Sequence, residues 1–150
     1  MSQLSLTEFA DRLDEILPVI MREFARRHTG ELYKGKISLP QFLALGFING
    51  QGQAKMTDMA RYMAVSTAAM TGIVDRLVRD GYTVRAYDQK DRRIIKIKLT
   101  QKGVKLVKKI KQERRLLAIK VFGKISEAER QDYLRILTRI HDILVNENTI

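Results

Sequence analysis

The amino-acid sequence predicts a mainly α-helical chain that contains one small β-hairpin. Apolar residues recur every three or four positions over most of the 150 residues, which is the period of a helix with one buried face. Between residues 82 and 99 the period changes to two, as in a half-buried strand. Because 45% of the residues are hydrophobic and the length is that of one domain, we expect one globular domain or one subunit of a small oligomer.

Two helices are expected in the first third of the chain. The apolar spacing predicts a helix over residues 5–28, in which Pro18 removes the hydrogen bond to the Asp14 carbonyl and should cause a kink or a break. A second helix should begin at Ser38, which can cap it, with Pro40 in its first turn. The turn at residues 49–52 should end this second helix.

Two short helices should follow, close together in sequence. Thr57 can cap the first helix and Ser66 the second, with a tight turn at residues 64–65 between them. The second helix should run to Asp80, because Gly81 is typical of the position just after a helix end.

A β-hairpin and two more helices complete the expected order. Alternating apolar and polar residues predict strands at 82–86 and 94–99, joined by a polar link with a basic tip. Thr100 should cap a long helix that continues to about residue 121. Ser126, with a glutamate three residues later, fits a capping box that opens the last helix.

The positive charge is concentrated in one segment. The chain carries 28 Lys and Arg against 17 Asp and Glu, for a formal net charge of +11. Residues 76–115 hold 15 of the basic and 4 of the acidic side chains, so this segment carries the whole excess. Such a segment is either a binding surface for an anion, such as nucleic acid or a membrane surface, or a solvated helix face.

Several classes of function have no support in the sequence. The absence of cysteine excludes disulfides, thiolate nucleophiles and cysteine-ligated zinc. His28 and His141 fall in different predicted helices without metal-ligand spacing, and we expect both to be partly exposed or to lie at a subunit seam. Residues 50–52 lack the Lys-Ser/Thr ending of a phosphate-binding loop. We therefore expect no catalytic residue, no metal and no cofactor, and the protein is not predicted to be an enzyme.

The sequence gives no sign of a membrane-spanning or targeting segment. No stretch approaches the roughly 18 apolar residues of a membrane span. The N-terminal residues carry more acidic than basic side chains, whereas a secretory signal or a transit peptide is rich in basic ones. The expected location is therefore cytoplasmic, without a membrane partner.

The order helix, turn, helix, hairpin predicts a winged helix–turn–helix. The second helix of such a pair lies in the major groove of double-stranded DNA, which is wide enough for one helix. Residues 66–71 offer small polar side chains that would let the backbone of this helix approach base edges. The opposite face carries apolar anchors, namely Met70, Ile73, Val74 and Leu77. The hairpin tip, with Lys90, Arg92 and Arg93, can reach phosphates or a narrow minor groove.

Motifs over most of the chain resemble those of MarR-family (multiple antibiotic resistance) regulators. Residues 56–60, 65–77 and Gly81 resemble the family's helix–turn–helix, and residues 38–42 fit the entry to its second helix. Asp91-Arg92-Arg93, followed by Leu99-Thr100-Gln101-Lys102-Gly103, is similar to the family's wing signature Asp-x-Arg…Leu-Thr-x-x-Gly. The wing departs from the family at Gln89, where a proline is common, and at Ala86, where a basic residue is common.

The resemblance implies a homodimer that binds pseudo-palindromic operators and usually represses transcription. It implies that residues 1–37 and 104–150 are dimerisation helices and that residues 38–103 form the DNA-binding lobe. By the same resemblance Arg93 enters the minor groove, oriented by Asp91, and Arg76 contacts the DNA backbone. Recognition-helix contacts would come from Ser66, Thr67, Ala68 and Thr71. A small phenolic or other amphipathic effector often binds between the lobe and the dimer helices of such proteins.

Apolar stripes at both ends of the chain agree with dimerisation. They offer more apolar surface than one small core needs. The residues concerned are Phe9, Leu13, Ile16, Leu137, Ile140 and Leu144.

The same side chains also have ordinary structural interpretations. Thr67 and Thr71 could be exposed helix residues, Arg92 and Arg93 a solvated turn, and Asp91 a turn former. The basic helix face at residues 102–115 is expected to be solvated, and the methionines at 56, 59, 63 and 70 should fill the core. A rival function is a sequence-independent polyanion binder, for RNA or a membrane surface, that uses the basic helix. The rival leaves the wing signature unexplained.

Overall fold

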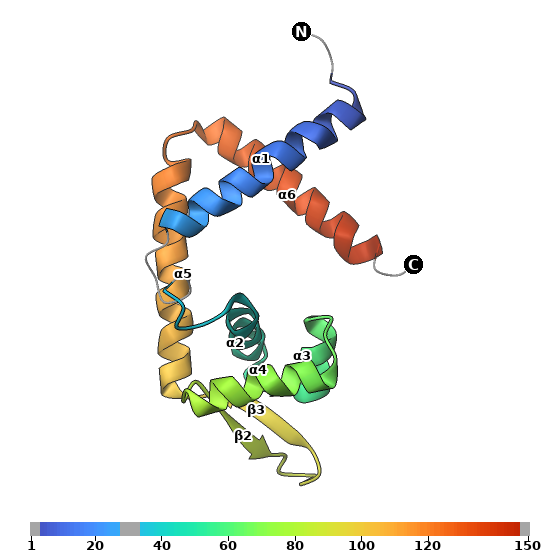
Figure 1. Ribbon diagram of the computed structural model, residues 1–150, viewed down its shortest axis with the longest axis vertical. Coiled ribbons are helices and arrows are strands. Elements are labelled where there is room, and N and C mark those ends of the chain that lie inside the picture. The colour runs from blue at the N-terminus through green and yellow to red at the C-terminus, as the bar shows by residue number, and fades with distance from the viewer. Residues whose placement is uncertain (1–3, 28–33, 148–150) are drawn as a thin grey trace. The chain divides into compact units, whose positions relative to one another are not determined.

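The computed structural model describes residues 4–27 and 34–147, which form six helices and three short strands (Figure 1). In chain order these are α1 Leu6–Arg27, α2 Leu39–Gln51, β1 Ala54–Lys55, α3 Met56–Tyr62, α4 Thr67–Arg79, β2 Thr83–Tyr87, β3 Ile95–Leu99, α5 Gln101–Phe122 and α6 Glu127–Glu147. The chain divides into two compact units, Met1–Glu113 and Arg114–Ile150, and α5 contributes to both. The expected fold class, mainly α with a small β-hairpin, is confirmed. The prediction for His28 lies outside the described residues.

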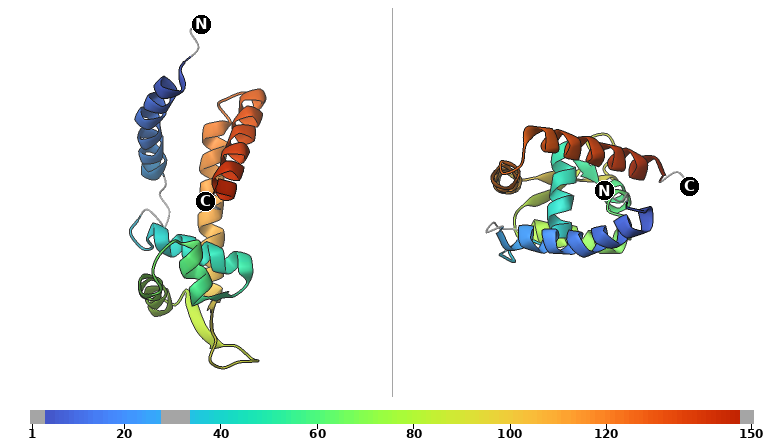
Figure 2. Two further views of the ribbon diagram at one scale, coloured as in Figure 1. Left: turned by 90° about the vertical axis from the view of Figure 1, so that its right-hand side faces the viewer. Right: turned by 90° about the horizontal axis from the view of Figure 1, so that it is seen from above.

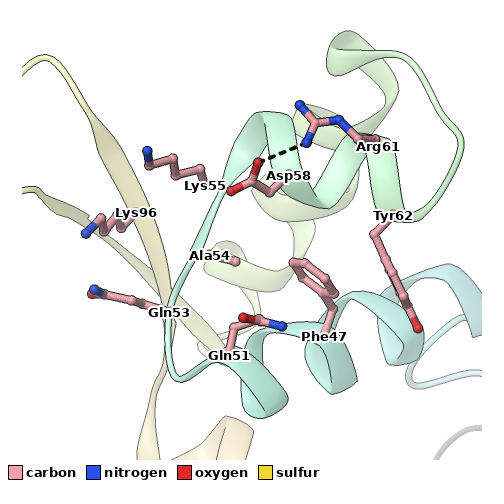
Figure 3. Close-up of a pocket in the computed structure, with 9 residues that line it drawn as sticks. All are labelled: Phe47, Gln51, Gln53, Ala54, Lys55, Asp58, Arg61, Tyr62 and Lys96. Atoms are coloured by element: carbon pink, nitrogen blue, oxygen red, sulfur yellow. Dashed lines mark ion pairs between the residues drawn. The ribbon is translucent and has the colours of Figure 1, made fainter.

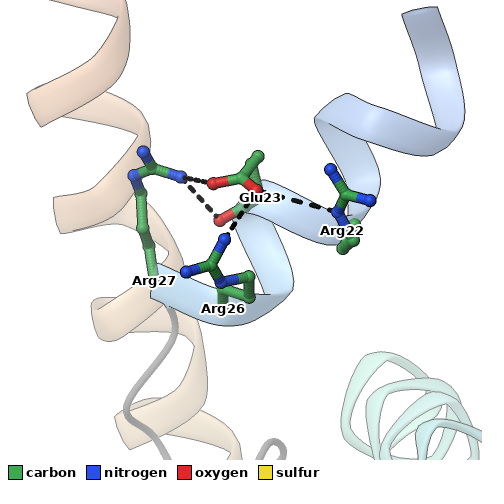
Figure 4. A network of polar contacts seen from close by, with 4 residues as sticks. All are labelled: Arg22, Glu23, Arg26 and Arg27. Carbon is green, nitrogen blue, oxygen red and sulfur yellow. Dashed lines mark hydrogen bonds and ion pairs between the residues drawn. The ribbon is translucent and has the colours of Figure 1, made fainter.

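Helix α1 runs without interruption through Pro18, so the expected break does not occur. A proline removes one backbone hydrogen bond, which is not enough to end a helix of 22 residues. None of the residues of α1 is buried. Near its end, Glu23 accepts hydrogen bonds from Arg26 and Arg27, one helical turn away (Figure 4). The hydrogen bond from Arg27 is the main cause of the lowered pKa of Glu23.

Helix α2 begins with the predicted cap. Ser38 Oγ accepts a hydrogen bond from the Gln41 backbone N–H at 3.3 Å, and Gln41 Oε1 accepts one from the Ser38 N–H at 2.8 Å. This reciprocal pair is a capping box, and Pro40 occupies the first turn as expected. The helix ends at Gln51, before Gly52 with its positive φ of 76°.

The hydrophobic core lies where α2, α3, α4 and the start of α5 meet the sheet. Its fully buried side chains include the predicted anchors of α4, Met70, Val74 and Leu77, while Ile73 packs at the edge of the core. Met59 is buried and Met56 and Met63 are partly buried, so the prediction of core methionines is confirmed. Leu106 of α5 is also buried but was not among the predicted core residues.

The sheet has three antiparallel strands in the order β1-β3-β2. The predicted hairpin strands are present, each shifted by one residue at one or both ends. Strand β1 was not predicted, because a two-residue segment has no period of its own and is defined only by pairing Ala54 with Ile97. Since β1 leads directly into α3, Lys55 occupies the cap position and makes no side-chain cap. The prediction that Thr57 caps this helix is therefore wrong.

Local capping also defines the two C-terminal helices. Thr100 Oγ1 accepts a hydrogen bond from the Gly103 N–H at 3.1 Å at the start of α5. Ser126 and Glu129 form the predicted capping box of α6. Within the second unit, the rings of Phe122 and Tyr133 lie 5.3 Å apart.

Candidate nucleic-acid interface

The turn between α3 and α4 fixes the direction of the second helix. The Val65 N–H donates to the Ala60 carbonyl at 3.0 Å, and the Ala64 N–H donates to the Arg61 carbonyl at 3.2 Å. These are the two hydrogen bonds of a Schellman motif. Ala64 has a φ of 52°, in the left-handed region that glycine prefers. The tight turn predicted at residues 64–65 is thus present.

Helix α4 presents a sharp division between a buried and an exposed side. Ser66 Oγ accepts a hydrogen bond from the Ala69 N–H at 3.1 Å and so caps the helix as predicted. Met70, Val74 and Leu77 are completely buried, whereas residues 66–69 are exposed. The first turn is therefore held firmly by the core and covered only by small side chains, which allows a close approach to a groove.

The two other candidate positions on α4 differ in availability. The Thr71 hydroxyl donates to the Thr67 carbonyl of the same helix at 2.8 Å, and Thr71 is only half-buried. Its hydrogen is therefore already committed, while its methyl group and its oxygen lone pairs can still contact a ligand. Arg76 is exposed one and a half turns further along the helix.

The turn between β2 and β3 is organised by Asp88. Asp88 Oδ1 accepts hydrogen bonds from the backbone N–H groups of Lys90 and Asp91 at 2.8 and 3.1 Å. Asp88 Oδ2 lies 2.6 Å from Lys96 Nζ on β3. The Lys96 side chain, followed by the two backbone donors, lowers the pKa of Asp88 to about 2. The Asp88 carboxylate thus orders a turn in which residue 89 is glutamine and not the proline that is common at this position of the wing.

Asp91 holds the arginine at the end of the wing. Arg93 Nε and Nη2 donate to Asp91 Oδ1 and Oδ2 at 3.1 and 3.3 Å, and the Arg93 backbone N–H also donates to Oδ1 at 3.0 Å. Hydrogen bonding from Arg93 lowers the pKa of Asp91. The Arg93 side chain is nevertheless 91% exposed, so the guanidinium is oriented without being covered. Figure 2 shows the turn that carries it extending away from the helices of the lobe.

Comparison with known proteins identifies the fold and the family. Residues 37–95 match the MarR family. YfiV, an uncharacterized HTH-type transcriptional regulator of Bacillus subtilis, is 30% identical to this chain over 112 residues, which cover 73% of this chain and 70% of YfiV. The chain belongs to the MarR family. It is a DNA-binding transcriptional regulator, since this family consists of such regulators and not of enzymes.

Several solved structures share this fold. A MarR family protein from Bacillus stearothermophilus has a TM-score of 0.80 at 22% identity and covers 95% of this chain and 99% of its own. Streptococcus pneumoniae FabT, solved in complex with DNA, has a TM-score of 0.78 at 20% identity with the same coverage. Bordetella bronchiseptica BpsR, whose DNA binding is regulated by 6-hydroxynicotinic acid, has a TM-score of 0.67 at 21% identity and covers 94% and 99% of the two chains.

Sequence reasoning missed an ion pair that joins the recognition helix of this MarR-type lobe to its wing. The guanidinium of Arg85 on β2 contacts the carboxylate of Asp75 on α4. Because the two residues are ten positions apart on different elements, no local pattern could indicate the pair. The contact ties the angle of the hairpin to the exposed side of α4.

A second set of contacts fixes the end of α4 against the start of α5. Lys102 Nζ donates to the Asp80 carbonyl at 2.7 Å and lies 4.7 Å from the centre of the Tyr82 ring. Thr100 Oγ1 donates to the Gly81 carbonyl at 2.6 Å. The carbonyls of the two residues that follow α4 therefore find partners on Thr100 and Lys102. The Leu-Thr-x-x-Gly motif supplies this junction in addition to the cap of α5.

The structure gathers the candidate residues of the MarR-type lobe on two elements. Ser66, Thr67, Ala68, Thr71 and Arg76 lie on or at the start of α4, and Asp91, Arg92 and Arg93 lie in the wing turn. Among the described residues, no group of three His, Asp or Glu side chains is arranged to hold a metal ion. Within residues 4–27 and 34–147, no helix combines the length and the apolar character of a membrane span.

Proposed function

We propose that this protein is a homodimer that represses transcription by binding a pseudo-palindromic operator. The observation that carries the proposal is the exposed first turn of α4, with small side chains at residues 66–69 above a fully buried face. The wing places an oriented arginine, Arg93, on the same lobe. A helix with one buried face and an exposed first turn of small side chains can enter the major groove, while the wing arginine reaches the minor groove beside it. FabT, which shares the fold, has been solved in complex with DNA, and this supports the proposal.

Dimerisation is supported by apolar side chains on both terminal helices. On α1, Phe9, Leu13 and Ile16 are 41–53% exposed, and on α6, Leu137, Ile140 and Leu144 are 42–60% exposed. Two stripes of this length are more apolar surface than a monomer normally leaves in water. Light scattering at micromolar concentration should give the mass of two chains. A folded monomer under these conditions would refute the dimer.

Two-fold symmetry then determines the form of the operator. Two recognition helices that face the same side of a duplex must lie about one helical turn apart, so the half-sites should be centred roughly 10 bp from each other. Selection of bound duplexes from a random library should enrich an inverted repeat with this spacing. Recovery of sequences without any shared motif would instead favour the sequence-independent polyanion binder. Footprinting that protects one isolated half-site at full affinity would contradict the dimeric reading.

Release from the operator by a small effector completes the proposal. The DNA binding of BpsR, which has this fold, is regulated by 6-hydroxynicotinic acid, a small aromatic acid. A compound that binds one arrangement of the DNA-binding lobes better than another would shift the protein away from its DNA-binding form. Sequencing the genomic DNA bound in the host would name the target genes and thereby the compounds to assay. The test is a loss of operator affinity on addition of such a compound, with scrambled duplex as control.

A further inference from the structure

The outer face of the sheet carries an unusual group of lysines. In the register of β1 and β3, Lys55 lies directly opposite Lys96, and Lys98 follows on the same face because side chains alternate along a strand. The intervening Ile97 and the neighbouring Ala54 point to the core, where they are 0% and 5% exposed. The three lysines therefore share the face that is turned away from the core.

This arrangement has an electrostatic cost in the free protein. Residues directly opposite each other in an antiparallel pair have Cβ atoms only about 5 Å apart, and like charges there are destabilising. Asp88 compensates one of the three charges through its 2.6 Å contact with Lys96. The side chains of Lys55 and Lys98 form no ion pair or hydrogen bond with any residue in the described part of the chain. The face thus keeps two lysines whose charge nothing in the lobe offsets.

A groove of about 560 Å³ lies along the edge of this face, at β1 and α3. Figure 3 shows Gln53, Lys55 and Lys96 extending to one side of β1, while Phe47 and Tyr62, whose rings stack at 4.5 Å, lie on the other. An extended anion that follows the sheet face could use the cations alone.

We propose that Lys55 and Lys98, with Gln53 beside them, bind phosphates of the duplex that flanks the operator. This inference rests on the proposed function. Strand β3 begins directly after the wing turn and carries Lys96, three positions after Arg93, and then Lys98. Lys55 lies beside Lys96 on the neighbouring strand β1. Duplex DNA carries a negative charge about every 1.7 Å along its axis, so DNA that continues past the wing presents the complementary charge to this face. Binding there removes the like-charge repulsion that the free lobe retains.

The test compares two lengths of operator duplex for the wild type and a double variant, Lys55→Gln with Lys98→Gln. One duplex ends at the wing contacts, and the other extends by roughly one helical turn on each side. The wild type should bind the longer duplex more tightly, with a salt slope steeper by up to about 3.6 for four added phosphate contacts per dimer. The double variant should lose this gain and keep its affinity for the short duplex. Lys120→Gln with Lys124→Gln, which removes the same charge from the second unit, should retain the gain.

The outcomes separate this inference from the proposed function. The inference is overturned if the longer duplex gives no gain with the wild type, or if the double variant keeps the gain. The proposed function fails instead if the wild type does not distinguish operator from scrambled duplex at either length. Lys55→Gln should leave the thermal midpoint unchanged or raise it, because it removes one partner of a like-charge pair. A lowered midpoint would contradict the electrostatic argument for this face.

Discussion

Asp91→Asn should weaken operator binding although it removes a negative charge from a DNA-facing turn. Asp91 holds Arg93 through both carboxylate oxygens, at 3.1 and 3.3 Å. Asparagine keeps an acceptor for the Arg93 backbone N–H but loses the charged, bidentate partner of the guanidinium. The arginine then samples many rotamers, and this freedom must be lost when it enters a groove. The loss should make operator binding roughly threefold to tenfold weaker per protomer.

The effect of Asp91→Asn on operator binding is compared with the effect of Arg93→Ala, which removes the guanidinium itself. Each cation that contacts B-DNA contributes about 0.9 to the slope of log K against log salt, so losing one per protomer lowers the slope of the dimer by about 1.8. Between roughly 50 and 200 mM salt, the affinity defect of this variant should therefore shrink about twelvefold. An unchanged slope would mean that Arg93 does not contact DNA.

The assay is a double-mutant cycle by fluorescence anisotropy with operator and scrambled duplexes. Asp91→Asn should bind scrambled DNA as tightly as the wild type or more tightly, and the operator less tightly. In the Arg93→Ala background it should no longer weaken operator binding, because its effect depends on the arginine. If Asp91→Asn instead tightens binding to both duplexes, the carboxylate only repels DNA. If it weakens operator binding equally in both backgrounds, it does not act through Arg93.

Three further predictions follow from other contacts. Thr67→Ala should narrow the affinity gap between operator and scrambled duplex by about 1–3 kcal/mol per contacted base pair. Thr71→Val should preserve this gap, because the Thr71 hydroxyl donates within the helix and valine keeps the methyl group for contact with a base. Gly103→Ala should lower the free energy of unfolding in urea by about 1–3 kcal/mol, despite the better helix propensity of alanine. The reason is that a Cβ there would lie 2.1 Å from the Tyr82 carbonyl oxygen. Because the folded pKa of Asp88 is lowered from 3.8 to about 2, its stabilising effect is complete above about pH 4 and is lost as the pH falls toward 2. The difference in thermal midpoint between the wild type and Asp88→Asn should therefore disappear over that range.

Helix starts were predictable because their determinants are local. The caps at Ser38, Ser66, Thr100 and Ser126 each satisfy a backbone N–H within three residues, so sequence spacing alone indicates them. The buried side of α4 was predictable for the same reason, since the helical period places its anchors on one face. The Asp91–Arg93 contact was expected from the resemblance to the MarR family and is present, whereas its role on DNA remains a prediction.

Features that depend on chain segments far apart were not predictable. Strand β1 exists only through its partner β3, about forty residues later, and its presence moved the cap of α3 from Thr57 to Lys55. The contact between Asp75 and Arg85 depends on the angle between a helix and a strand, which no spacing rule gives. The role of Asp88 as the organiser of the wing was also missed, because its partner Lys96 meets it only after the hairpin closes.

The acidic residues within the basic segment 76–115 explain how an excess of positive charge can be part of an interface that distinguishes one DNA sequence from another. Three acids within residues 76–115 each hold a cation: Asp80 contacts Arg79, Asp88 contacts Lys96 and Asp91 contacts Arg93. A cation held by a carboxylate meets DNA in one orientation, whereas a cation without such a partner attracts any phosphate within a Debye length of about 10 Å. Removing an acid should therefore change the difference between operator and scrambled DNA. Removing an unpaired lysine should change both affinities together, provided that both duplexes are long enough to reach that lysine. The same segment can in this way supply general attraction to DNA and a defined geometry at the wing.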